Sequence, residues 1–386
     1  MVVYFIPKNN NIWIFGSMQG IKYLDNARYL FEYIHENTSV NAIWISKDKM
    51  IIESLQQKGY TAYWEYSLKG IIYASRAKVA VITHRGNRNQ ADLPFYLMNN
   101  KTLIIQLWHG IGLKKMAYDD NIFSFKRNEK ALLWKLKTII QNTFLPYLGY
   151  LNKPSVVTVL AKNTQIIFAK ALRLDIKNVY ISGYPRNDIL LHKSFFQDKR
   201  TIQKLIYMPT FRGSANSDFD LFTQYQFNVK ILDTFLSNMN MELSIKLHPY
   251  NKPSHYLLQE ISQAKNIHLL KNEDVYEILA NYDILLTDYS SVYFDFLLLD
   301  RPIIFTPFDK NEYLKKERKF YFDYDEVTPG PHASNWNEVM HHILFYKNSP
   351  EAYKTPRNIL KKKFHTFTDV NSRERIYEII NKQLNN

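Results

Sequence analysis

Short apolar runs alternate with helix-length segments along most of the chain. In the first half, apolar runs occupy residues 11–15, 42–45, 79–83, 102–108, 156–160 and 178–182, and a helical pattern occupies 26–36. In the second half, apolar runs occupy 204–208, 243–247, 267–270, 283–287 and 303–306. Strands that alternate with helices form parallel sheets. The pattern therefore predicts an α/β protein.

The chain has 386 residues, which is more than one hydrophobic core usually supports. We predict two Rossmann-like domains, 1–185 and 186–386, that face a central cleft and are joined near residues 183–203. The C-terminal helix could pack back on the first domain. Ligands of such sheets bind beyond the carboxyl ends of the strands, so polar residues that follow a predicted strand are candidate site residues.

One such segment is Thr-Asp-Tyr-Ser-Ser at 287–291, after the apolar run 283–287. Asp288 ends the strand, and Ser290 and Ser291 open a helical pattern. The unpaired amides of a helix's first turn can hold a phosphate group. The simpler alternative is that one of the serines only caps the helix.

A second strand ends in Trp-His-Gly at 108–110. The neighbouring glycine allows a ligand to approach the backbone, and a histidine can act as a general base near neutral pH. His109 is thus a candidate catalytic residue. The alternative is a histidine without a chemical role.

Three further strand exits carry cationic or hydroxyl side chains. Strand alternation puts Lys246 and His248 on one side of the chain before Pro249, where they suit a phosphate oxygen. Thr210 and Arg212 follow the run 204–208, and Arg186 follows the run 178–182. Arginine is well suited to bidentate phosphate contacts.

Composition narrows the class of partner. The formal net charge is +14, which favours an anionic partner: nucleic acid, a polyphosphate substrate or an acidic membrane face. The basic residues are spread along the chain, with only a short run at 361–363, so we expect no nucleic-acid binding. The chain has no cysteine, which excludes disulfides, thiolate zinc sites and cysteine nucleophiles, and fits a cytoplasmic location.

Membrane attachment, if any, should be peripheral, because no apolar stretch approaches the roughly 18 residues of a spanning helix. Residues 126–145 form a basic amphipathic pattern with Trp134, which can lie in a membrane interface. The alternative is a surface helix that packs on its own domain. We expect no metal or other cofactor: Asp218 and Asp220 fall in a polar loop, and the pair at 341–342 lacks nearby carboxylates.

Taken together, these segments resemble the CDP-glycerol glycerophosphotransferase family of teichoic acid and capsule synthesis. The matching motifs are Trp-His-Gly at 108–110, Gly-Tyr-Pro-Arg-Asn-Asp at 183–188, Met-Pro-Thr-Phe-Arg at 208–212, Lys-Leu-His-Pro at 246–249 and Thr-Asp-Tyr-Ser-Ser at 287–291. The resemblance implies a GT-B fold. It also implies transfer of glycerol phosphate from CDP-glycerol to a hydroxyl of a lipid-linked or polymeric glycan, with CMP as the leaving group.

By this resemblance the first domain faces the acceptor and the membrane, and the second binds CDP-glycerol. His109 and His248 are the predicted catalytic residues, with His109 as the base. The predicted donor-binding residues are Arg186, Thr210, Arg212, Asp288, Ser290 and Ser291, to which strand geometry adds Lys246.

Acceptor and chain length stay open. The family usually has Thr-Pro where this chain has Ile111-Gly112, and often glycine at the positions of Lys319 and Val370. The short first domain is more typical of a primase or a compact capsule transferase than of a long-chain polymerase. CDP-ribitol and nucleotide sugars remain alternative donors.

Overall fold

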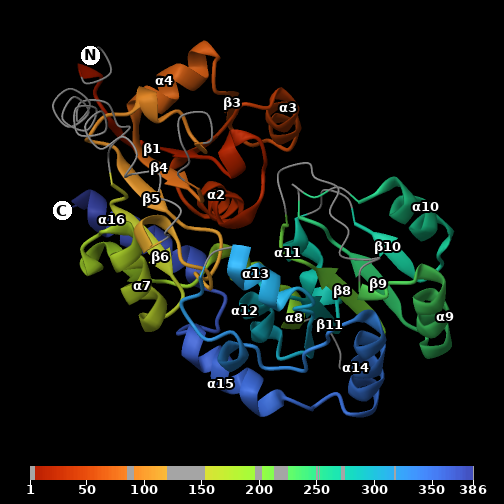
Figure 1. The fold of residues 1–386 in the computed structure, drawn as a ribbon. Coiled ribbons are helices and arrows are strands. Elements are labelled where there is room, and N and C mark those ends of the chain that lie inside the picture. Colours follow the sequence, from red (N-terminus) through yellow and green to blue (C-terminus); the bar gives the residue numbers. More distant parts are fainter. Residues whose placement is uncertain are drawn as a thin grey trace, which may run out of the picture. The chain divides into compact units, whose positions relative to one another are not determined.

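The computed structural model describes residues 5–84, 91–119, 153–195, 202–212, 225–248, 251, 253–270, 274–316 and 319–385. The chain forms two compact units (Figure 1). The first unit contains residues 1–111, 116–189 and 365–386, and the second contains 112–115 and 190–364. The predicted segment 126–145 and the pair Asp218 and Asp220 lie outside the described residues.

The first unit is built on a parallel sheet. Its strand order is β3 (Ala62–Trp64), β2 (Asn41–Ser46), β1 (Asn9–Phe15), β4 (Ala77–Ile82), β5 (Leu103–Gln106), β6 (Val156–Val159) and β7 (Val179–Ile181). Strands β2 and β3 lie on one side of β1, and β4 to β7 lie on its other side, so the strand order reverses between β1 and β4. This is the topological switch point, where ligands of such sheets bind.

Helices complete the first unit. They are α2 (Asp25–Asn37), α3 (Lys49–Gln57), α4 (Leu68–Arg76), α7 (Lys162–Leu172), the first half of α8 (Pro185–Phe195) and α16 (Ser372–Asn385). Because side chains alternate along a strand, Trp13 and Phe15 enter the core with α2 and α16, whereas Ile12 and Ile14 enter the core of the opposite face. Residues 365–386, which include α16, therefore complete the first unit although they end the chain.

The second unit has a parallel sheet in the order β10 (Ile267–Leu269), β9 (Glu242–Ile245), β8 (Lys204–Met208), β11 (Ile284–Thr287) and β12 (Ile303–Phe305). Here the order reverses between β8 and β11. Its helices are the second half of α8, α9 (Val229–Met239), α10 (His255–Gln263), α11 (Val275–Ile278), α12 (Val292–Phe296), α13 (Lys310–Lys316), α14 (Trp336–Asn348) and α15 (Lys354–Phe364).

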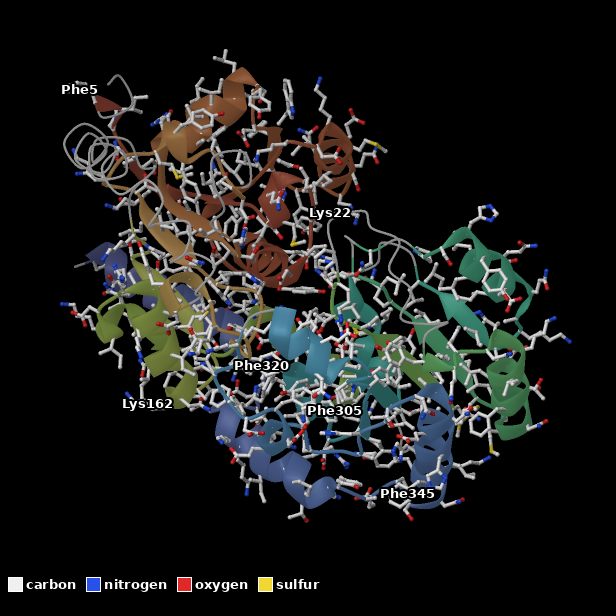
Figure 2. The ribbon with its side chains drawn as sticks, in the orientation of Figure 1. Phe5, Lys22, Lys162, Phe305, Phe320 and Phe345 are labelled. Carbon is white, nitrogen blue, oxygen red and sulfur yellow. The ribbon has the colours of Figure 1, made fainter. Side chains whose placement is uncertain are left out.

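The core of this unit lies between the sheet and its helices. Phe305 is fully buried at the end of β12, and Figure 2 shows it among the elements of the second unit. Phe345, on the outer side of α14, is 39% exposed. Trp336 opens α14 and packs edge to face on Tyr207 of β8, with ring centroids 5.1 Å apart. This packing joins the central strand to the covering helix.

The predicted α/β class with parallel sheets is confirmed, and each predicted apolar run contains a strand. Three details differ from the prediction. The three-residue strand β3 was missed, because so short a run carries no period. Strand β5 ends at Gln106, since the backbone turns at Trp108 with a φ of 60°. Strand β9 ends at Ile245, so Lys246 and His248 follow the strand instead of lying in it.

Candidate active site

Most predicted donor residues meet at the switch point of the second sheet. Thr210 and Arg212 follow β8, and Asp288, Ser290 and Ser291 follow the adjacent strand β11. Lys246 and His248 follow β9, on the other side of β8. The carboxyl ends of these parallel strands lie at one edge of the sheet. The structure therefore brings together residues that are up to 81 positions apart in the sequence.

Arg212 is the best-connected side chain at this edge. Its guanidinium makes a bidentate contact with Asp309, at 2.6 Å from Nε and 2.9 Å from Nη2. Nη2 also lies 2.7 Å from Asp288 Oδ2. Burial disfavours the charge of Arg212, but the two carboxylates outweigh it and raise the pKa of the guanidinium. The rings of Tyr289 and Tyr313 lie 4.9 and 4.5 Å from it.

Asp288 connects the two central strand exits. Its carboxylate is fully buried, and Oδ1 accepts hydrogen bonds from the backbone amides of Thr210 at 2.8 Å and Tyr289 at 2.6 Å. Asp288 and Arg212 were predicted to contact the donor. In the structure both side chains are engaged with the protein and build the frame that holds Thr210. Asp309, which completes this frame, was missed because no motif marks it.

The hydroxyl groups at this edge are less constrained. Thr210 Oγ1 is buried and has no hydrogen-bond partner among the described residues. Ser291 precedes α12 in a helical backbone conformation and makes no side-chain cap. Ser290 Oγ accepts a long hydrogen bond of 3.4 Å from the amide of Val292. Capping thus does not account for Ser291.

The helix after these serines is shorter than its sequence pattern suggested. Helix α12 has five residues and passes directly into a 3₁₀ turn at Leu297–Leu299. The few aligned peptide dipoles of so short a helix add little attraction for an anion. A phosphate at this edge would depend on side-chain hydroxyls and cations more than on the helix.

His248 is half-buried beside Phe211, with ring centroids 5.4 Å apart. Burial, and then the charge of Lys114, lowers the pKa of His248 to about 4. The imidazole is therefore neutral at neutral pH. A neutral ring can donate one hydrogen bond to a phosphate oxygen but supplies no positive charge.

Lys114 lies in the second unit although it follows the Trp-His-Gly motif in the sequence. The amide of Lys115 donates to the carbonyl of Lys319 at 2.7 Å, and the amide of Tyr321 donates to Leu113 at 2.9 Å. These bonds attach the segment 112–115 to the unit that contains His248. Lys114 Nζ lies 5.0 Å from the centre of the Tyr313 ring. No role was predicted for this lysine.

His109 is exposed and follows β5 in the first unit. Its ring stacks on Trp108, with centroids 5.1 Å apart and planes 15° apart. Trp108 has a left-handed backbone, with a φ of 60°, which is uncommon for a residue other than glycine. Asn26 holds this turn by donating from Nδ2 to the Trp108 carbonyl at 3.0 Å.

The tautomer of His109 follows from one contact. Nδ1 lies 3.3 Å from the backbone carbonyl of Thr83, which can only accept a hydrogen bond. Nδ1 therefore carries the proton, and Nε2 carries the lone pair in the neutral ring. A base needs that lone pair, so the exposed ring is in the form that can take a proton at Nε2.

Arg186 contacts the backbone of His109. Its Nη1 donates to the carbonyl of His109 at 3.0 Å and pairs with Asp25 Oδ1 at 2.9 Å. The side chain is buried in the first unit. Arg186 was predicted to bind the donor together with residues of the second domain, and it lies in the first unit beside His109. Strand order alone did not reveal that α8 begins in the first unit.

The sequence profile of the family described as CDP-Glycerol:Poly(glycerophosphate) glycerophosphotransferase matches residues 1–382. The chain belongs to this family. The resemblance inferred from the motifs is confirmed, and the chain is an enzyme that transfers glycerol phosphate with CDP-glycerol as the donor.

Two curated relatives have the same kind of name. The teichoic acid poly(glycerol phosphate) polymerase of Bacillus spizizenii is 30% identical, over 93% of this chain and 88% of its own length. The teichoic acid glycerol-phosphate transferase of Staphylococcus aureus is 28% identical, over 97% of this chain and 94% of its own length.

The fold agrees with a solved structure. The wall teichoic acid polymerase TagF superposes with a TM-score of 0.72, at 22% identity, over 98% of this chain and 90% of that chain. The two units of this family member thus have the GT-B architecture that the resemblance implied. No helix among the described residues is both long and apolar enough to cross a membrane.

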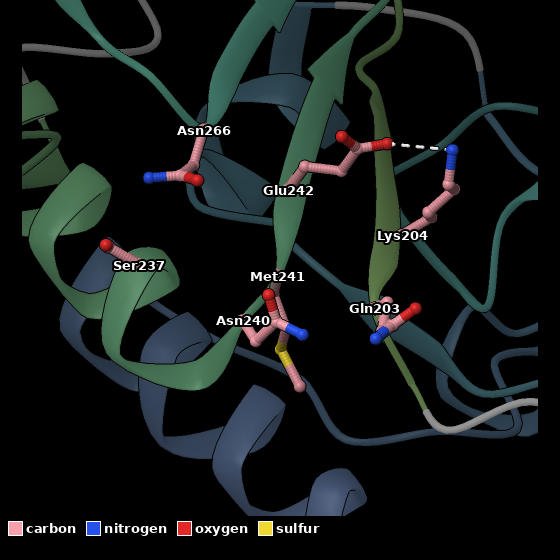
Figure 3. A pocket seen from close by; sticks show the side chains of 7 residues that line it. All are labelled: Gln203, Lys204, Ser237, Asn240, Met241, Glu242 and Asn266. Atoms are coloured by element: carbon pink, nitrogen blue, oxygen red, sulfur yellow. Dashed lines mark ion pairs between the residues drawn. The ribbon is translucent and has the colours of Figure 1, made fainter.

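A separate polar pocket lies at the opposite, amino-terminal edge of the second sheet (Figure 3). It has a volume of about 260 Å³ and is lined by Gln203, Lys204, Ser237, Asn240, Met241, Glu242 and Asn266. Lys204 and Glu242 form an ion pair of 3.1 Å on its wall. None of the residues predicted for the glycerophosphotransferase reaction lies here. In the described part of the chain no cluster of three or more potential metal ligands occurs.

Proposed function

We propose that this glycerophosphotransferase transfers glycerol phosphate to a hydroxyl group of a lipid-linked or polymeric glycan, in the synthesis of a teichoic acid or capsule-type polymer of the cell envelope. The second unit binds CDP-glycerol, and the first unit supplies the acceptor side and the base. The observation that carries the proposal is the convergence of Thr210, Ser290, Ser291 and His248 at the switch point of the second sheet.

The proposed donor site binds the pyrophosphate through hydroxyl groups and two lysines. Thr210 Oγ1 has no hydrogen-bond partner among the described residues and the Ser291 side chain does not cap the helix, which supports their use on a ligand. Lys246 and Lys114 supply positive charge, and neutral His248 donates a hydrogen bond. Asp288 and Arg212 act indirectly, because they hold the Thr210 backbone.

The proposed reaction is an in-line displacement at the phosphorus that bears glycerol. The acceptor oxygen forms a bond to that phosphorus, the bond to the CMP oxygen breaks, and the hydroxyl proton passes to His109 Nε2.

Product analysis tests the activity itself. We expect CMP release from CDP-glycerol, and acceptor products heavier by whole glycerol phosphate units, when lipid-linked glycans are supplied and analysed by mass spectrometry. CDP-ribitol and a nucleotide sugar serve as matched donors. Faster turnover of either would assign the site to that donor instead, and the number of added units separates a primase from a polymerase.

Replacement of the base tests the proposed chemistry. We expect His109→Ala to lower turnover by about 10²–10⁴-fold, because general base catalysis contributes about that much. The donor affinity, measured by calorimetry, should change little. His268→Ala, an exposed histidine on β10, is the control. CMP release near the wild-type rate by His109→Ala would remove His109 from the mechanism.

The serines allow binding and capping to be separated. We expect Ser291→Ala to keep its melting temperature and lose about 1.5–3 kcal/mol of CDP-glycerol binding, about tenfold or more, because a hydrogen bond to a charged group is lost. Ser290→Ala should show the same direction. The control is Ser254→Ala, whose Oγ accepts from the amide of Leu257 at 3.2 Å and caps α10.

That control should lose about 1 kcal/mol of stability and keep its donor affinity. Wild-type affinity in both serine variants would contradict the proposed donor site.

We further propose that the enzyme acts in the cytoplasm, peripherally on the inner face of the membrane, through the basic segment 126–145. The support is its sequence pattern and a lipid-linked acceptor. Each lysine near an anionic surface contributes about 1 kcal/mol, which salt screens. We expect co-sedimentation with anionic vesicles to weaken with salt and in Lys135→Glu/Lys137→Glu. Lys361→Glu/Lys362→Glu, with the same charge change, is the control, and equal binding by both variants would refute this role.

A further inference from the structure

One buried carboxylate of the first unit, Asp92, has no role in the proposed reaction. Asp92 is fully buried, and its oxygens accept four hydrogen bonds. Oδ1 accepts from the amide of Gln19 at 2.7 Å. Oδ2 accepts from the amide and hydroxyl of Thr83, at 2.9 and 3.0 Å, and from the amide of His84 at 2.6 Å. Asp92 thus joins the exits of β1 and β4, at the switch point of the first sheet.

The contact with Thr83 leads directly to the proposed base. The amide and hydroxyl of Thr83 are held by Asp92, and its carbonyl is the group that accepts from His109 Nδ1 at 3.3 Å. The next residue, His84, is also held by Asp92, and its ring lies 5.6 Å from that of His109. The orientation of this carbonyl therefore depends on a carboxylate that does not touch His109.

The backbone around Asp92 is closely packed and held by further hydrogen bonds. A Cβ atom at Gly16 would clash with the Asp92 carbonyl oxygen, so the end of β1 packs closely on this residue. Lys47 Nζ donates to the carbonyls of Gln19 and Ala91, on both sides of the carboxylate. Burial raises the pKa of Asp92 to about 7, against the hydrogen bonds that favour the charged form.

We propose that Asp92 is a positioning residue that sets the tautomer of His109 through the backbone of Thr83. The inference rests on the proposed role of His109 as the base. When Asp92 holds Thr83, the carbonyl of Thr83 accepts the Nδ1 proton and Nε2 keeps its lone pair for the acceptor hydroxyl. When that hold is lost, the carbonyl turns away and the proton distributes between the two nitrogens. The share of His109 in the reactive tautomer then falls.

Nitrogen NMR of histidine-labelled protein measures this directly, without substrate. Long-range proton–nitrogen spectra distinguish the two tautomers, and the spectrum of His109→Gln identifies the signals of His109. We expect the Nδ1-protonated form in the wild type and a larger Nε2-protonated share in Asp92→Asn. The NH₂ group of the asparagine can only donate, whereas the amides and hydroxyl that contact Asp92 need an acceptor, so part of the contact with Thr83 and its neighbours is lost. Turnover should fall about tenfold to a hundredfold at unchanged KM for CDP-glycerol.

Two further variants separate positioning from folding. Thr83→Ala removes only the hydroxyl contact of 3.0 Å and should shift the tautomer in the same direction, even if Asp92→Asn does not fold. Glu65→Gln changes another buried carboxylate of the same unit, which accepts from Tyr96 at 3.1 Å. It should leave both the tautomer and turnover unchanged.

The outcomes are decisive in both directions. An unchanged His109 tautomer in Asp92→Asn, or in Thr83→Ala if the first variant does not fold, overturns the inference, as does an equal shift in Glu65→Gln. Wild-type turnover by His109→Ala would instead refute the proposed base, and the tautomer measurement would still report whether Asp92 controls the ring.

Discussion

Each sheet reverses its strand order at one point, and in each unit a buried aspartate holds the two strand exits together there. Backbone amides that leave a strand lose their ladder partners and must find others when they are buried. Asp92 accepts amides from the exits of β1 and β4, and Asp288 accepts the Thr210 amide after β8 and its own neighbour's amide after β11. These two carboxylates thus hold the backbone of Thr83, which His109 contacts, and of Thr210.

The two units offset the cost of a buried charge differently. In the second unit Arg212 neutralises Asp288 and Asp309, with Tyr289 and Tyr313 against the guanidinium. A buried carboxylate that loses such a partner is strongly unfavourable, so the three charged groups act as one. In the first unit the donors to Asp92 are backbone amides and one hydroxyl, and burial raises the pKa of its carboxyl to about 7. The second unit thus holds its aspartate with an arginine, whereas the first holds its aspartate with neutral donors.

The two candidate histidines differ in the same physical terms. His109 is exposed, and a backbone carbonyl defines its tautomer, as a proton acceptor requires. Burial, and then the charge of Lys114, lowers the pKa of His248 to about 4, so its ring is neutral at neutral pH. A neutral imidazole can donate one hydrogen bond but supplies no positive charge. The two histidines thus differ in their chemistry because their burial and neighbours differ.

The sequence by itself determined the α/β class, every strand except β3, and the family. Apolar runs must be buried and strand exits carry the polar motifs, so Thr210, His248 and Ser291 could be assigned to one edge before any contact was known. The tertiary structure alone decided which of these side chains remain available to a ligand. Arg212 forms ion pairs with Asp288 and Asp309. Arg186 donates a hydrogen bond to the carbonyl of His109. No sequence motif marks Asp92. Its position matters only because the ends of β1 and β4, which are distant in the sequence, share it as a buried hydrogen-bond acceptor.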